Sequence, residues 1–213
     1  MRLENKVVVV TGAGSGLGKA VSLKVASQGA DLVLADINGE AIARTAAEVE
    51  AMGRKALQCV VDVCNGESVN QMIADAVAAY GQIHGLVNSA GIFSSIPFLD
   101  LTERDWDRMI NINLKGSFLC AQSFIRQAVE QKTGASIVFL SSISGFIGFT
   151  KSAHYCASKG AVRQLSKAIA LEFGPNGIRS NVVAPGTIET PMNAWIIDDP
   201  EMHKQSVASI PMG

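Results

Sequence analysis

The chain has 213 residues, of which 48% are hydrophobic and 17% are charged, so it can bury one sizeable core. Its 18 basic and 19 acidic residues give a formal net charge of -1, which argues against nucleic acid or membrane as a partner. Its four cysteines form no CxxC pair and have no histidine at metal-ligand spacing, which predicts a reduced, metal-free, cytoplasmic chain. We therefore expect a single domain over residues 1–213.

Six short runs rich in β-branched residues predict strands, and segments of helical periodicity alternate with them. The strands are expected at residues 6–11, 31–35, 56–61, 83–88, 136–140 and 179–183. The helices are expected at residues 16–29, 38–53, 66–80, 102–132 and 152–174. Because several strands are apolar on both faces, the pattern predicts a Rossmann-like α/β fold, a doubly wound parallel sheet with helices on both faces.

The first predicted strand leads directly into a glycine-rich turn, Thr11-Gly12-Ala13-Gly14-Ser15-Gly16-Leu17-Gly18, and a helix is expected to follow. Glycines in such a turn allow positive φ and let backbone N–H groups approach a pyrophosphate at the helix N-terminus. A glycine-rich turn without a ligand is the alternative interpretation. The strand before the turn and the helix after it favour dinucleotide binding.

An acidic residue, Asp36, ends the second predicted strand, 20 residues beyond Gly16. A carboxylate there can accept hydrogen bonds from both hydroxyls of the adenosine ribose, and it would repel a 2′-phosphate. Neither Ser15 in the turn nor Ile37 after the aspartate is basic, so we expect NAD as cofactor and disfavour NADP. In the alternative interpretation, Asp36 caps the helix that begins near Asn38.

Tyr155 and Lys159 stand four positions apart in the last predicted helix and therefore project from one helix face. Ser141 and Ser142 follow the strand predicted at 136–140. Each residue taken singly has a structural interpretation, as a packing tyrosine, a solvated lysine or a turn serine. The spacing of the tyrosine and the lysine nevertheless brings an ammonium close enough to act on a phenol.

With these residues in place, the order of motifs resembles the single-domain short-chain dehydrogenases/reductases over essentially the whole chain. The family's Thr-Gly-x3-Gly-x-Gly turn matches residues 11–18, and Ser89 replaces the second asparagine of its Asn-Asn-Ala-Gly segment. The resemblance implies that the cofactor is bound by Gly12, Ser15, Gly16, Leu17, Gly18, Asp36, Ile37, Asp62, Val63, Asn88, Ala90, Gly91, Tyr155, Lys159, Pro185, Gly186, Ile188 and Thr190.

The same resemblance implies four catalytic residues, Asn113, Ser142, Tyr155 and Lys159. Tyr155 would be the acid/base, and ionising a phenol at pH 7 requires about 4 kcal/mol of preferential stabilisation. An ammonium at about 4 Å supplies an energy of this order at an effective dielectric near 20. Ser142 would hold the substrate oxygen, and Asn113 would bind a water that links Lys159 to solvent. The reaction implied is hydride transfer between a nicotinamide and a secondary alcohol or ketone.

Four apolar residues fall near the expected mouth of the substrate pocket and indicate a partly apolar substrate, although each could equally be core: Phe146, Phe149, Met192 and Trp195.

Family members usually continue for several dozen residues more, adding a helical segment and a final strand. We therefore expect a sheet without the family's last strand and with residues 179–183 at its edge. Because the family commonly forms tetramers, we also expect a homo-oligomer, a dimer or a tetramer.

Two other functions remain open at this stage. The motifs also permit a 3-oxoacyl-carrier-protein reductase, although those reductases mostly prefer NADPH, which Asp36 disfavours. A non-catalytic regulator that binds NAD(H) without turnover is the second alternative. The complete set of four catalytic residues argues against it.

Overall fold

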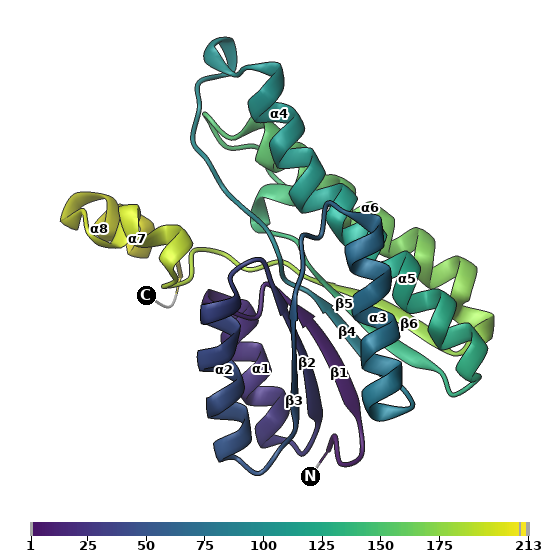
Figure 1. The fold of residues 1–213 in the computed structure, drawn as a ribbon. Helices are drawn as coiled ribbons and strands as arrows, with labels where there is room; N and C mark the ends of the chain where they lie inside the picture. The colour runs from purple at the N-terminus through teal and green to yellow at the C-terminus, as the bar shows by residue number, and fades with distance from the viewer. Residues whose placement is uncertain (1, 209, 212–213) are drawn as a thin grey trace.

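The computed structural model describes residues 2–208 and 210–211. Residues 1, 209, 212 and 213, which the single-domain prediction includes, lie outside the described residues. Six strands pair in parallel in the order β3-β2-β1-β4-β5-β6 (Figure 1). They are β1 (Val7–Thr11), β2 (Asp31–Asp36), β3 (Ala56–Val60), β4 (Gly85–Asn88), β5 (Ala135–Leu140) and β6 (Ile178–Val183). All six predicted strands are confirmed, with small shifts of their ends.

Apolar side chains cover both faces of the central strand β1. Val7 and Val9 belong to one buried cluster, whereas Val8 and Val10 belong to another. Helices α3 (Gly66–Tyr80), α5 (Gly116–Gln131) and α6 (Ala153–Phe173) pack into the first cluster, and α1 (Gly16–Ser27) and α2 (Gly39–Ala51) into the second. Helices therefore cover both faces of the sheet, as Figure 1 shows, and the predicted doubly wound fold is confirmed.

The helix predicted at 102–132 is interrupted. It consists of α4 (Glu103–Ile110), a π-helical turn η2 (Asn111–Lys115) and α5. A π-helical turn inserts an extra residue without ending the helix, and such turns are frequent at functional sites. The periodicity of the flanking segments does not reveal it, which is why the sequence predicts one continuous helix.

The segment after β6 forms two short helices, α7 (Ala194–Ile197) and α8 (Pro200–Ala208), for which the sequence predicted no elements. Figure 1 shows both helices standing out beyond the end of the sheet, away from its layers. β6 is the outermost strand on its side, as expected, and Val183 at its end is 51% exposed. Across residues 2–208 and 210–211, the helices are too short or too polar to cross a bilayer.

Short 3-10 turns connect these elements at Phe98–Asp100, Ile143–Gly145, Gly174–Asn176 and Pro191–Asn193. Thr102 caps α4, since its hydroxyl accepts the Asp105 N–H at 3.2 Å. A polar residue therefore fixes the start of α4.

One polar contact at the amino end of the sheet makes the fold sensitive to acid. The backbone N–H of Val7 donates to the ring nitrogen Nδ1 of His84 at 3.1 Å. The backbone N–H of His84 donates to the Val7 carbonyl at 2.9 Å. Burial, and after it the charge of Lys6, lowers the pKa of His84. Because the folded pKa lies below the unfolded one, this contact contributes its full stability above about pH 6.5 and loses it as the pH falls.

We predict that His84→Ala lowers the free energy of unfolding by about 1 kcal/mol at pH 7, because the Val7 N–H loses its acceptor. The gap between variant and wild type should shrink at pH 5, where protonation of His84 removes the same acceptor from the wild type. Urea unfolding of both proteins at the two pH values measures this. A gap of constant size would contradict the assignment.

Candidate active site

The carboxyl ends of all six strands open into one cleft of about 820 Å³. In a parallel sheet these ends lie along one edge, so the loops that follow the strands meet there. Most of the predicted site residues line the cleft: Gly12, Ser15, Gly16, Leu17, Gly18, Asp36, Ile37, Asp62, Val63, Ala90, Gly91, Ser142, Tyr155, Lys159, Pro185, Gly186, Ile188 and Thr190. Asn88 and Asn113 do not line it, and both side chains are buried.

The glycine turn packs so closely that side chains would not fit in it. A Cβ on Gly12, whose φ is +67°, would lie 2.9 Å from the Ala90 backbone, and a Cβ on Gly18 would overlap the Gly12 carbonyl oxygen. The Thr11 hydroxyl accepts the N–H groups of Ser89 and Ala90, each at 3.2 Å. The turn is therefore clamped to the loop after β4, and its backbone remains open to the cleft.

Asp36 is held by the turn rather than by the helix that follows it. Its carboxylate accepts the Gly14 N–H and the Asn38 N–H, each at 3.0 Å. The cap of α2 is Asn38, whose side chain accepts the Ala41 N–H at 3.0 Å. The alternative interpretation of Asp36 as the helix cap is therefore wrong, because Asn38 takes that role.

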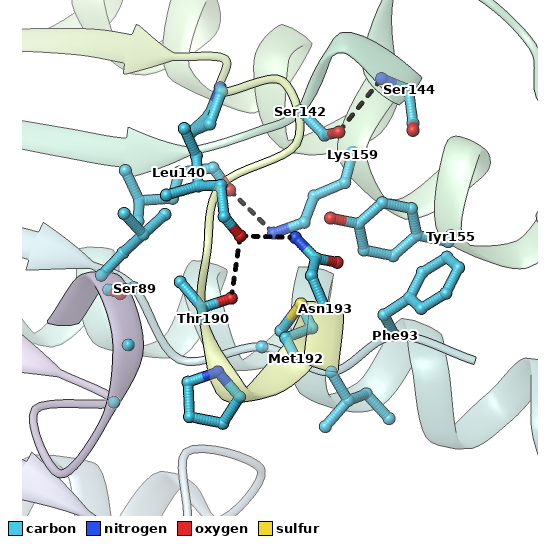
Figure 2. Close-up of a pocket in the computed structure, with 18 of the residues that line it drawn as sticks. Ser89, Phe93, Leu140, Ser142, Ser144, Tyr155, Lys159, Thr190, Met192 and Asn193 are labelled. Carbon is cyan, nitrogen blue, oxygen red and sulfur yellow. Dashed lines mark hydrogen bonds between the residues drawn. The ribbon is translucent and has the colours of Figure 1, made fainter. Parts of the chain in front are cut away.

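The segment after β6 closes over the turn from the other side of the cleft. Thr190 lies next to Gly16, since a Cβ there would be 3.5 Å from the Thr190 Cβ. The Ile188 carbonyl accepts the Asn193 side-chain amide at 2.9 Å and the Thr190 hydroxyl at 3.4 Å, as Figure 2 shows. A carboxamide group from the chain itself thus binds the backbone carbonyl of Ile188, a residue that the resemblance assigns to cofactor binding.

Asp62 and Val63, two of the residues expected to bind the cofactor, follow β3. The Asp62 carboxylate accepts the Cys64 N–H at 2.9 Å, which shapes the loop, and Val63 is largely buried. Asn88, the last residue of β4, donates its side-chain amide to the Ser117 carbonyl at 3.4 Å. Asn88 therefore supports the strand end from behind the cleft.

Tyr155 and Lys159 lie on the same face of α6, and both point into the cleft (Figure 2). The Lys159 Nζ is 5.7 Å from the centroid of the Tyr155 ring and donates to the Leu140 carbonyl at 2.8 Å. Ser142 follows β5 on the same side, and its hydroxyl accepts the Ser144 N–H at 3.1 Å. The predicted serine, tyrosine and lysine are thus brought together at one end of the cleft.

Comparison with known proteins agrees with this geometry. A family model described as short chain dehydrogenase matches residues 6–201. The chain belongs to the short-chain dehydrogenase/reductase family. It is 39% identical to a 3-oxoacyl-(acyl-carrier-protein) reductase of Thermotoga maritima, over 100% of this chain and 85% of the relative.

Two further relatives of this short-chain dehydrogenase/reductase carry other activities or ligands. A 2,5-dichloro-2,5-cyclohexadiene-1,4-diol dehydrogenase of Sphingobium indicum is 39% identical, over 100% of this chain and 84% of the relative. The crystal structure of a short chain dehydrogenase from Mycobacterium paratuberculosis bound to NAD has a TM-score of 0.89 at 30% identity. That match covers 100% of this chain and 82% of the other.

Burial governs the electrostatics of the pair on α6. Lys159 is 7% exposed, and desolvation lowers the pKa of its ammonium to about 8. Burial also raises the pKa of the Tyr155 phenol, and a hydrogen bond with the Ser142 side chain opposes part of that rise. The phenol is therefore protonated at neutral pH, and its ionisation depends on positive charge placed beside it.

Asn113 of this short-chain dehydrogenase/reductase sits in the π-helical turn and is fully buried. Its side chain accepts the Ile92 N–H at 2.8 Å and donates to the Ile92 carbonyl at 3.0 Å and to the Ser158 hydroxyl at 3.2 Å. It thereby ties the loop after β4 to α6. The water-binding role implied by the resemblance stays a prediction.

Sequence analysis missed Phe93, which lines the cleft beside Tyr155. The signal available was its place two residues after the Ala90-Gly91 motif, but an aromatic residue in a loop is as easily interpreted as core. Of the four residues expected at the pocket mouth, Phe149, Met192 and Trp195 line the cleft. Phe146 does not line it. Its ring lies instead 4.3 Å from the Arg163 guanidinium.

The buried ammonium should make wild-type stability rise with alkaline pH. Between about pH 8, the folded pKa of Lys159, and 10.5, its ordinary value, the unfolded chain binds more protons than the folded one. We predict that Lys159→Met is more stable than the wild type by about 2 kcal/mol at pH 7, because desolvation outweighs the lost Leu140 hydrogen bond. The advantage should vanish near pH 10.5.

Chemical unfolding of Lys159→Met and the wild type at pH 7 and at pH 10 measures this difference. A variant that is less stable than the wild type at pH 7, or a difference that does not change with pH, would contradict the account of the buried charge.

Proposed function

We propose that the chain is an NAD(H)-dependent oxidoreductase which transfers hydride between a nicotinamide and a secondary alcohol or ketone, with Tyr155 as general acid/base. The observation that carries this proposal is the grouping of Ser142, Tyr155 and Lys159 at one end of a cleft that the glycine turn and Asp36 line. An isolated tyrosine and lysine pair would not imply this chemistry. The family membership and the cofactor cradle beside the pair support it.

The residues present fit a dinucleotide. Gly12 and Gly18 leave a cradle that side chains would fill, and the turn precedes the N-terminus of α1, where backbone N–H groups favour a pyrophosphate. The Asp36 carboxylate has acceptor capacity beyond its two backbone hydrogen bonds, which suits two ribose hydroxyls. A 2′-phosphate about 4 Å away would meet up to about 4 kcal/mol of repulsion at an effective dielectric of 20. The NAD-bound Mycobacterium relative agrees with this preference.

The chain's own groups then divide the work of proton transfer. When bound, the nicotinamide supplies the hydride acceptor or donor. In reduction, the Tyr155 phenol donates its proton to the substrate oxygen. In oxidation, the phenolate takes the hydroxyl proton while the Lys159 ammonium stabilises its charge. The Ser142 hydroxyl, which lies next to the phenol, holds the substrate oxygen by a hydrogen bond.

A second candidate function is reduction of a 3-oxoacyl group on a carrier protein, which the name of the Thermotoga relative supports. The carboxylate of Asp36, with non-basic Ser15 and Ile37 beside it, favours NAD-linked alcohol chemistry instead. A regulator that binds NAD(H) without turnover would keep the cradle and show no activity. The single domain, the homo-oligomer and the cytoplasmic location stay predictions.

We predict that Tyr155→Phe lowers kcat for oxidation of secondary alcohols by at least about 100-fold, because the proton acceptor is removed. The chain has two tyrosines, and Tyr80→Phe is the matched control. Tyr80 ends α3 outside the cleft, and its hydroxyl donates to the Leu32 carbonyl of β2. Appearance of reduced nicotinamide absorbance with a panel of alcohols measures both variants. NAD binding without turnover on any alcohol would support the regulator instead.

We predict that Asp36→Asn shifts the ratio of NADP to NAD affinity toward NADP by roughly 10- to 1,000-fold, because the repelling charge is lost. Asp75→Asn, on the exposed side of α3, is the control and should leave the ratio unchanged. Calorimetric titration with each cofactor measures the ratio. A wild type that already binds NADP as tightly as NAD would contradict the role given to Asp36.

A further inference from the structure

Phe93 touches both the acid/base residue and the segment after β6. Its ring meets the Tyr155 ring edge-on, with centroids 5.0 Å apart and an interplanar angle of 88°. Its ring also stacks with Trp195 of α7, with centroids 6.0 Å apart and an angle of 5°. Figure 2 shows Phe93 beside the Tyr155 ring. One side chain on the loop after β4 therefore joins α6 to α7.

A hydrogen bond next to Phe93 fixes the loop on α6. The Ser94 hydroxyl lies 2.8 Å from Nε2 of His154, the residue that precedes Tyr155. Two consecutive loop residues thus contact two consecutive helix residues, one pair through a polar contact and the other through aromatic rings. We call this set, Phe93, Ser94, His154 and Tyr155, the Phe93 clip.

The state of His154 follows from its burial. The side chain is fully buried, and its Nδ1 has no hydrogen-bond partner in the part of the chain that the structure describes. An unpartnered buried N–H is harder to accommodate than an unpartnered ring nitrogen, so the proton belongs on Nε2, which donates to Ser94. A buried histidine with one free nitrogen is a poor packing residue, and its contact with Ser94 gives a reason for its presence.

The clip determines what lies beside the reacting centre. Phe93, Trp195 and Met192 all line the cleft, and Phe93 touches the tyrosine that would exchange the proton. A hydroxylated carbon skeleton placed against these side chains would lose water without gaining hydrogen bonds, whereas a hydrocarbon skeleton would gain burial. These three side chains form an apolar wall of the cleft. The wall favours substrates with apolar groups on the carbon that bears the reacting hydroxyl.

We propose that Phe93 is a specificity-determining residue, held in place by the Ser94–His154 hydrogen bond, which selects secondary alcohols whose carbinol carbon belongs to a hydrocarbon ring or chain. This inference rests on the proposed function and names the substrate class of the same site. Phe93 selects the substrate by forming an apolar wall with Trp195, and Tyr155 performs the proton transfer at the edge of that wall.

The test compares two alcohols that share a six-carbon ring, cyclohexanol and myo-inositol, in the NAD-linked assay. The wild type should have the higher kcat/KM for cyclohexanol by at least about 100-fold. Phe93→Ala should lower kcat/KM for cyclohexanol by about 10-fold or more, chiefly because KM rises. The kcat/KM for myo-inositol should change little. Phe98→Ala, in the same loop but 70% exposed and outside the cleft, should leave the preference unchanged.

The support from His154 is tested in the same assay. His154→Ala should lose part of the preference for cyclohexanol over myo-inositol, as Phe93→Ala does. His154→Gln, which keeps an N–H donor for Ser94, should retain that preference. The contact with α7 is tested by tryptophan fluorescence in a Trp106→Phe background, where Trp195 is the remaining tryptophan. Phe93→Ala should make Trp195 more accessible to acrylamide quenching, while Phe98→Ala should not.

The outcomes separate this inference from the function on which it rests. Equal losses on both alcohols, an unchanged preference in Phe93→Ala, or a wild type that prefers myo-inositol would overturn the role of Phe93 while leaving the oxidoreductase intact. No turnover of any alcohol by a wild type that binds NAD would overturn the proposed function, and the inference with it.

Discussion

The site depends on an ammonium group that the fold keeps out of water. Lys159 is 7% exposed, and its Nζ donates at 2.8 Å to the carbonyl of Leu140, the last residue of β5. Burial lowers the pKa of this ammonium, so the chain gives up stability to keep a charge beside the Tyr155 ring. Burial also raises the pKa of the Tyr155 phenol.

The parallel sheet explains how this pair meets the other parts of the cleft. β1 and β4 are neighbours, so the glycine turn packs against the loop that carries Ala90 and Phe93. β5 is next in the sheet and brings Leu140 to Lys159. The hydroxyl of Thr11 binds the loop after β4 to the end of β1. The side-chain amide of Asn113 binds the same loop to α6. The glycine turn and the Tyr155–Lys159 pair thus lie along one edge of the sheet.

Much of this arrangement could be predicted from the sequence because it depends on local patterns. Strand periodicity, the glycine turn and the spacing of Tyr155 and Lys159 each constrain a short segment. The π-helical turn around Asn113 could not be predicted, since one inserted residue leaves the flanking periodicity intact. Phe93 acquires its role only through a partner distant in sequence, Trp195, on which its ring stacks. No spacing rule identifies such contacts.

The central claim is that Lys159 is a buried cation whose charge is poised near neutral pH. Its most direct test is a pH titration of the Lys159 Cε chemical shift by carbon NMR in protein labelled with ¹³C-lysine, with Lys159→Met to assign the signal. The account predicts a midpoint at about pH 8, well below the ordinary value of 10.5 for a lysine side chain. A Lys159 signal that titrates at about pH 10 or above, as an unperturbed ammonium does, would contradict it.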